Sequence, residues 1–304
     1  MDTFLDGVSI CVFTYNFQEY LRQALESILQ QNCNFPIQII IGDDCSTDNT
    51  RTIAESYQKK YPEIIKLSFN EKNIGGARNW IETISKSKRK YISLLDGDDF
   101  FCDNLKLQKQ YNALEQNLEC VLCMHSVREI YETDNKIDEI IEFEKNTYTI
   151  EDILKKGWFI RTGSVFFRNG ILPMEFPEWV FDYPYRFDTI LQVFLCTKGY
   201  IVNLKEVMSV WRKHDKGMSL TFLQDKIENI QNVILLTKQL NSYTNKKYER
   251  AVNFYLSELN TYLFIFLLKS RKWWINRKNL LSSFRRMSFL KFINLLQKRY
   301  KTHN

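Results

Sequence analysis

The sequence of 304 residues is poor in glycine and proline, with 10 glycines and 5 prolines, and it lacks a long apolar run. This scarcity argues against long disordered linkers, and 44% apolar with 26% charged residues is ordinary for a globular protein. The longest apolar run, residues 262–268, stops at Lys269, well short of the roughly 20 residues that cross a bilayer. The composition therefore excludes an integral membrane protein and predicts a continuously folded chain.

The seven cysteines form no pair of Cys-x-x-Cys motifs, and no secretory signal precedes the first apolar segment. These absences favour a reducing, cytoplasmic environment. Cys120 and Cys123 have half of the spacing of a zinc site, but no second pair follows. We therefore interpret both as small buried side chains.

The first hundred residues alternate between short apolar, β-branched runs and amphipathic stretches. Runs of this kind are typical of strands buried on both faces, and their alternation with helices predicts a doubly wound, mostly parallel α/β sheet. Good N-cap residues, Ser46 to Asp48, precede the second helical stretch. The predicted strands are residues 8–14, 37–43, 64–69 and 91–96, and the predicted helices are residues 20–30, 49–60 and 79–85.

The pattern changes after residue 104. We expect a helix over residues 105–118, strands over 120–127, 162–167 and 207–211, and an almost wholly helical region from residue 221. The sequence therefore predicts two halves of one catalytic domain, residues 1–104 and 105–219, and a C-terminal helical region, residues 220–304.

The C-terminal region is strongly basic. Residues 241–304 contain fourteen lysines and arginines against two glutamates, which gives about +12 there and about −6 elsewhere. Its Trp, Phe and Leu residues favour a helix bound to an anionic membrane surface, which would make the protein peripheral at the inner face of the cytoplasmic membrane. A helical subdomain that packs on the rest of the chain or forms a homodimer is the alternative, and we expect no nucleic acid.

Three carboxylates, Asp96, Asp98 and Asp99, follow the predicted strand 91–96 within four residues. Neighbouring carboxylates repel one another, so a divalent cation is a natural partner. Taken alone, the cluster could equally be a solvated acidic turn in which Gly97 supplies the bend.

The other predicted strands also end in polar residues. These are residues 14–16, Asp43 with Asp44, and residues 70–78. Because ligands of parallel sheets bind beyond the carboxyl ends of the strands, four such clusters at one edge predict a binding site.

These four segments closely resemble family 2 glycosyltransferases with the GT-A fold. The resemblance rests on Val8-Ser-Ile-Cys-Val-Phe-Thr-Tyr-Asn16, Ile39-Ile-Ile-Gly-Asp-Asp-Cys-Ser-Thr-Asp48, Asn73-Ile-Gly-Gly-Ala-Arg-Asn79 and Leu95-Asp-Gly-Asp-Asp99. It implies transfer of a sugar from a nucleotide-sugar donor whose diphosphate is bound through Mn²⁺ or Mg²⁺.

The resemblance also implies roles for single residues at the donor site. Asp98 and Asp99 would bind the metal ion, and Asp96 would contact the ribose or support the metal ligands. His214, in the element Trp211-Arg-Lys-His214, would reach the metal or the diphosphate. Further donor contacts would come from Thr14, Tyr15 and Asn16 around the base, Asp44 at a uracil imide, Asn73, and Arg78 at a phosphate.

Arg78 and one further segment, residues 162–164, each have two possible roles. Arg78 could instead form a structural ion pair with Asp43 or Asp98. The segment Thr162-Gly-Ser164 could face the acceptor or simply begin a strand.

An inverting transfer needs a base that takes the proton of the attacking hydroxyl. The segment Pro177-Glu-Trp-Val-Phe-Asp-Tyr-Pro184 resembles a family region that places Asp182 at this position, with Glu178 and Asp188 as substitutes. Phe181 stands where the family commonly has glycine.

The sequence therefore predicts an inverting, metal-dependent glycosyltransferase that acts on a saccharide or lipid-linked saccharide in surface-polysaccharide synthesis, with a UDP-sugar as the expected donor. Two other functions compete with it. A Mg²⁺-dependent phosphohydrolase of the haloacid-dehalogenase type also carries Asp-x-Asp at a strand end, but that pattern needs Thr or Val where Phe100 stands. A nucleic-acid-binding protein would use the basic tail and leave the acidic residues without a role. The sequence does not specify the donor sugar, the acceptor or the linkage.

Overall fold

The computed structural model describes residues 4–132, 137–215, 217 and 226–269. The chain forms two compact units, and each is described by itself. Unit 1 comprises Met1–Ile150 with Trp158–Gly217, and unit 2 comprises Glu151–Gly157 with Met218–Asn304. The predicted boundaries at residues 104 and 219 stay predictions.

Unit 1 is built on a ten-stranded mixed sheet with the order β3-β2-β1-β4-β9-β6-β10-β5, with β7 beside β6 and β8 beside β10. Strands β3, β2, β1 and β4 are parallel, β9 is antiparallel to both β4 and β6, and β10 is parallel to β6. The strands are β1 (Leu5–Thr14), β2 (Ile37–Asp43), β3 (Ile65–Phe69), β4 (Arg89–Asp96), β5 (Phe100–Phe101), β6 (Cys120–Tyr131), β7 (Glu139–Ile141), β8 (Thr147–Tyr148), β9 (Phe166–Arg168) and β10 (Tyr200–Lys213).

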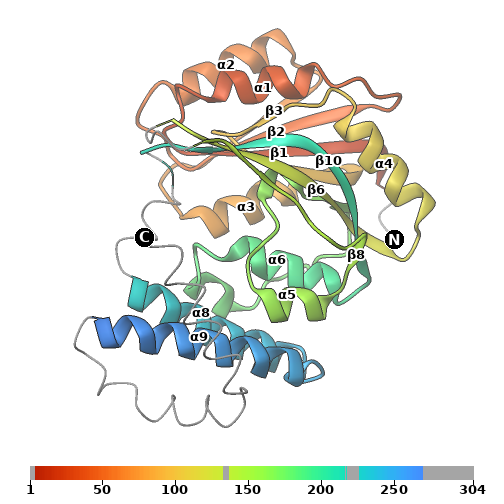
Figure 1. Cartoon of the computed structure of the whole chain (residues 1–304). Coiled ribbons are helices and arrows are strands. Elements are labelled where there is room, and N and C mark those ends of the chain that lie inside the picture. The colour runs from red at the N-terminus through yellow and green to blue at the C-terminus, as the bar shows by residue number, and fades with distance from the viewer. Residues whose placement is uncertain (1–3, 133–136, 216, 218–225, 270–304) are drawn as a thin grey trace. The chain divides into compact units, whose positions relative to one another are not determined.

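Helices cover both faces of this sheet, as Figure 1 shows for α1 and α2 on one face and α3 on the other. Apolar residues of α1, α2 and α4 form one core with alternate residues of β1, β2 and β4. These helices bury their apolar stripes because that removes hydrocarbon from water, at roughly 25 cal/mol per Å². The helices of unit 1 are α1 (Leu21–Leu29), α2 (Thr50–Lys60), α3 (Gly76–Ser85), α4 (Lys106–Gln116) and α6 (Phe187–Cys196), with short 3₁₀ helices η1 (Thr162–Ser164) and η2 (Glu178–Asp182). Helix α5 (Ile150–Lys156) belongs to unit 2 except for its first residue.

The predicted strands and helices of the first half are confirmed, but one later prediction is wrong. Residues 162–167 do not form a single strand, because a 3₁₀ turn occupies Thr162–Ser164 and β9 starts at Phe166. Both the amide and the hydroxyl of Ser164 donate to the Arg161 carbonyl, at 2.9 and 2.7 Å, and these local bonds close the turn.

Unit 2 contains two long helices, α8 (Lys226–Tyr243) and α9 (Glu249–Lys269), joined by a short connection. Ile234 of α8 packs with Leu259 and Leu263 of α9, and this apolar contact confirms the helical prediction over residues 226–269. No helix in the described segments has the length and apolarity that a bilayer span requires. The basic residues 271–299, on which the membrane and dimer predictions rest, lie outside the described residues.

Candidate active site

The loops after β1 and β2 interlock through side-chain hydrogen bonds. Asn16, which has a left-handed φ of 58°, accepts hydrogen bonds from the Thr47 amide at 2.8 Å and donates its own amide to the Ser46 hydroxyl at 2.9 Å. Asn16 therefore fixes the shape of the rim at these strand ends. Beside it, Tyr15 is 43% exposed, whereas the Thr14 hydroxyl is buried with no partner among the described residues.

Asp44, the residue after β2, fixes the loop that precedes α3. One carboxylate oxygen accepts from the Ile74 amide at 2.8 Å and from the Asn70 side chain at 3.1 Å, and the other accepts from the Gly75 amide at 2.9 Å. A carboxylate offers about four acceptor positions, so one remains for a ligand. Asn73 supports the same loop, since its side chain accepts from Gly75 at 3.2 Å.

Arg78 is exposed near the start of α3 and stacks on Phe181 of η2, with its guanidinium carbon 3.7 Å from the ring centroid. The alternative of an ion pair is not realised among the described residues, because Asp43 pairs with Arg51 and Asp98 pairs with His214. The guanidinium edge of Arg78 is therefore left without a carboxylate partner.

Gly97 brings the acidic cluster close to the end of β1. Its amide donates to the Phe13 carbonyl at 2.7 Å, and a Cβ at this position would lie 3.0 Å from that oxygen and 3.1 Å from the Thr14 Cβ. The close approach at this point therefore favours glycine.

Asp96 ends β4 next to this contact. Burial, followed by the charge of Asp98, raises the pKa of Asp96 to about 8, while the Thr162 hydroxyl of η1 acts in the opposite direction. The charge of Asp188 on α6 also raises the pKa of Asp96.

Asp98 and His214 form a close pair, with 3.0 Å between Asp98 Oδ2 and His214 Nε2. His214 is 2% exposed and packs against Tyr20, whose ring centroid lies 4.4 Å away, while its Nδ1 has no partner among the described residues. Two residues that are 116 positions apart in sequence thus share one site.

Asp99 has contacts of its own. Its carboxylate is 4% exposed and accepts the Arg212 amide of β10 at 2.8 Å, and burial raises the pKa of Asp99 well above its ordinary value. The Arg212 side chain donates to the Asp98 carbonyl at 2.8 Å and pairs with Glu132. This geometry ties the acidic turn to β10, and the role of Asp99 as a metal ligand stays a prediction.

Asp188 and Asp182 lie in different surroundings. Asp188, near the start of α6, accepts the Thr189 amide at 2.6 Å, and burial raises its pKa to about 6. Asp182 ends η2 and is exposed, and its charge acts on the neighbouring Tyr183. Of the two, Asp188 is therefore the carboxylate that the structure brings to the acidic cluster. In the sequence, Asp188 is distinguished only as a single acid at the start of an otherwise mostly apolar helix.

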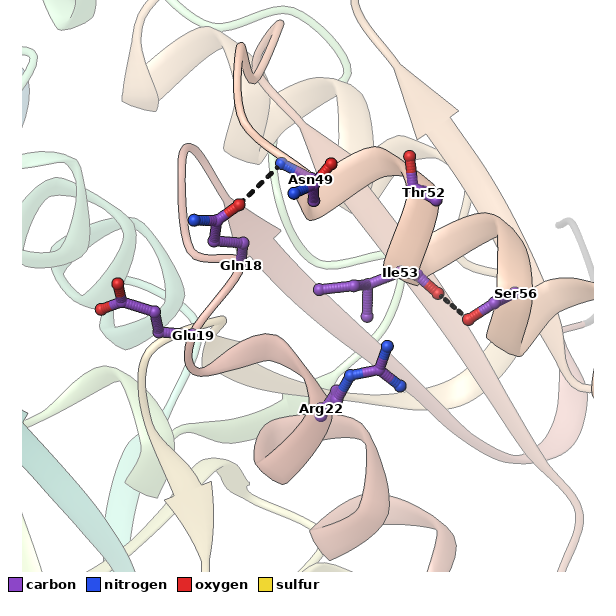
Figure 2. A pocket seen from close by; sticks show the side chains of 7 residues that line it. All are labelled: Gln18, Glu19, Arg22, Asn49, Thr52, Ile53 and Ser56. Atoms are coloured by element: carbon purple, nitrogen blue, oxygen red, sulfur yellow. Dashed lines mark hydrogen bonds between the residues drawn. The ribbon is translucent and has the colours of Figure 1, made fainter.

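A separate pocket of about 490 Å³ lies between the β1–α1 loop and α2 (Figure 2). Its lining comes from the outer side of the interlocked loops and contains none of the acidic site residues. The residues are Gln18, Glu19, Arg22, Asn49, Thr52, Ile53 and Ser56.

Comparison with known proteins identifies the family. The model of Glycosyl transferase family 2 matches residues 9–171, more than half of the chain. The chain belongs to glycosyltransferase family 2. This membership sets aside the phosphohydrolase and nucleic-acid alternatives, and it accounts for the four strand-end motifs.

Two curated relatives illustrate the range of this family. An uncharacterised protein of Mycobacterium tuberculosis is 35% identical over 211 residues, which cover 69% of this chain and 60% of that protein. GgaA of Bacillus subtilis, a minor teichoic acid biosynthesis protein, is 36% identical over 107 residues, which cover 34% of this chain and 24% of its own. The chain thus spans about 60% of the length of the mycobacterial relative.

Two solved structures share the fold at low sequence identity. TarS of S. aureus in complex with UDP-GlcNAc is 14% identical, with a TM-score of 0.60 over 93% of each chain. A mannosyltransferase from Pyrobaculum calidifontis in complex with GDP-Man and Mn²⁺ is also 14% identical, with a TM-score of 0.57 over 99% of this chain and 81% of its own. Both are consistent with a GT-A architecture.

Proposed function

We propose that this glycosyltransferase is an inverting, metal-dependent enzyme that transfers a sugar from a UDP-sugar to a saccharide or lipid-linked saccharide. The observation that carries the proposal is the pair of Asp98 and His214, which the turn after β4 and the end of β10 bring to 3.0 Å from each other, next to Asp96 at the end of β4. The UDP preference is supported by TarS, which binds UDP-GlcNAc, and GgaA supports a cell-surface polymer as the product.

The residues present fit a bound Mn²⁺ or Mg²⁺. An octahedral ion with ligands at 2.0–2.1 Å places neighbouring donor atoms about 3 Å apart, and Asp98 Oδ2 and His214 Nε2 are 3.0 Å apart. The described residues contain no group of three or more His, Cys, Asp or Glu side chains placed to hold a metal ion. A donor diphosphate would therefore complete the coordination, as is usual for Mg²⁺. When bound, the ion would offset the negative charge of the leaving diphosphate.

We take Asp188 as the candidate base, because its charge acts on Asp96 of the acidic cluster. The base must take a proton from the acceptor hydroxyl on the side opposite the leaving group, and a pKa of about 6 leaves Asp188 ionised at neutral pH yet more basic than an exposed aspartate. Asp182 as the base stays a prediction. Arg78, whose guanidinium edge is free of acids, is suited to the donor phosphates.

The test is a panel of nucleotide sugars incubated with the full chain and Mn²⁺, read as release of the nucleoside diphosphate, together with calorimetric binding of UDP. We expect turnover with one or more UDP-sugars and metal-dependent UDP binding. A chain that binds no nucleoside diphosphate and turns over no donor in the panel would contradict the proposal. Binding to anionic vesicles tests peripheral membrane attachment separately.

A further inference from the structure

Arg161 of unit 1, just before η1, lies in a corner between two tryptophans. Its guanidinium carbon is 3.9 Å from the ring centroid of Trp158 and 4.3 Å from that of Trp211. The two rings are 5.6 Å apart and nearly perpendicular, at 79°. Contact with two nearly perpendicular rings holds the guanidinium from two sides, while its terminal N–H donors can still bind a partner.

The hydrogen-bonding groups of Arg161 are poorly used. One terminal nitrogen donates to the Phe159 carbonyl at 3.5 Å, which is a weak hydrogen bond, and the buried Nε has no acceptor among the described residues. A guanidinium has five N–H donors, and burying them without acceptors costs on the order of 1–3 kcal/mol for each group left unsatisfied. A bound ligand would recover this cost.

The carboxylates near Arg161 have partners of their own. Glu129 on β6 pairs with Lys213 at 3.0 Å, Asp99 accepts a backbone amide of β10 at 2.8 Å, and Asp188 accepts a backbone amide of its own helix at 2.6 Å. All three act on Arg161 through their charges, so they are nearby, but none forms an ion pair with it in the described part of the chain. Arg161 is therefore a half-buried cation without a direct counter-ion, close to the proposed base.

Lys213 is a second cation beside the tryptophan pair. Its ammonium lies 4.1 Å from the ring centroid of Trp211, so Trp211 contacts both cations. Trp211 and Lys213 are two positions apart on β10, and alternate residues of a strand point to the same face. Because β10 pairs with β6 in parallel, Glu129 and Tyr131 lie opposite these two residues. The corner is thus part of the rim beyond β6 and β10.

We propose that Arg161 binds an anionic group of the acceptor, a phosphate or a carboxylate, next to the hydroxyl that Asp188 deprotonates. The inference rests on the proposed glycosyl transfer and specifies the chemical class of its acceptor. A planar guanidinium edge forms two parallel hydrogen bonds with either anion, and the tryptophan corner supplies the fixed orientation that such pairing requires. A neutral sugar would offer the guanidinium acceptors without a charge.

The test measures anion binding with the donor site filled. The full chain with saturating UDP and Mg²⁺ is titrated with glucose 6-phosphate, glucuronate or glucose while tryptophan emission is followed, because Trp158 and Trp211 border the site. We expect a saturable change with at least one of the two anionic sugars, at concentrations about tenfold below any change with glucose. The two anionic arms distinguish phosphate from carboxylate.

Variants assign the response to Arg161. Arg161→Met should abolish the emission change, and Arg161→Lys should weaken it, because lysine keeps the charge without the planar edge. Arg128→Met, at an exposed position on β6, is the control and should keep the emission change. Melting temperatures show that the variants fold, and Arg161→Lys carries the test if Arg161→Met does not.

Three outcomes would overturn the inference: equal binding of glucose and the anionic sugars, no response in a chain that binds UDP, or an Arg161→Met variant with the wild-type response. Failure of the wild-type chain to bind any nucleoside diphosphate would instead count against the proposed glycosyl transfer.

Discussion

The rim at the ends of β1, β2 and β4 differs from the rim at β6, β10 and α6 in how its polar side chains are held. In the first, Asn16 and Asp44 bind backbone amides of neighbouring loops. In the second, Asp188 accepts an amide of its own helix, and Arg161 is held mainly by aromatic contacts. The first rim is therefore preorganised by hydrogen bonds for a constant ligand part such as the nucleoside diphosphate, while charges of the second rim remain available for proton transfer and acceptor recognition.

The sharpest test of this difference compares the two candidate bases. Asp188→Asn should lower kcat about 10²–10⁴-fold, because the amide cannot accept the proton of the acceptor hydroxyl. Asp182→Asn is the matched control and should stay within about threefold of wild type, because Asp182 is exposed at the end of η2. Steady-state transfer rates under saturating donor and metal measure both.

A large loss in Asp182→Asn, with Asp188→Asn near the wild-type rate, would show that η2 rather than α6 supplies the base. In that case the second rim would also extend to the exposed end of η2.

A second comparison separates the two neighbouring acids of the cluster. Asp98→Asn should weaken metal-dependent UDP binding at least about 10–100-fold, since it removes a charged oxygen beside His214. Asp99→Asn should change it less than about threefold, because an amide oxygen can still accept the Arg212 N–H. Calorimetric titration with UDP, with and without Mn²⁺, measures both, and a comparable loss in Asp99→Asn would support the original assignment of Asp99 as a metal ligand.

The sequence predicted the first rim more completely than the second, and the reason is physical. The strands of the first rim are short apolar runs, and Asp44 acts on Ile74 and Gly75, which lie in a motif of their own. The roles of Asp99 and Asp188 depend on contacts with β10 and β4, far away in sequence. Three acids within four residues look alike in a sequence, and only the packing of distant strands shows that they have different contacts.

The pH dependence of transfer should report the second rim. Burial raises the pKa of Asp188 to about 6, while the Thr189 amide and the Arg186 charge act to lower it, with Asp96 and Arg161 as the other charged neighbours. Because the base must be ionised, kcat/KM should fall about tenfold per pH unit below about 6 and level off above it.

Rates of transfer from pH 5 to 8, at a metal concentration that saturates at each pH, measure this fall in kcat/KM. Arg186→Gln should move its midpoint upward, because it removes a charge that favours the ionised form. A flat profile across pH 5–7 would mean that Asp188 does not titrate in the reaction.

The smallest expected effect concerns the contact between Arg78 of α3 and Phe181 of η2. Phe181 stands where the family commonly has glycine, and its ring lies 3.7 Å from the Arg78 guanidinium carbon. An exposed cation–π contact contributes about 0.5–1 kcal/mol, so Phe181→Leu should raise the KM for the donor about two- to fivefold with kcat nearly unchanged. Phe181→Tyr keeps the ring and should behave as wild type. If both variants raise KM equally, the ring face does not orient Arg78, and the two rims bind their ligands independently.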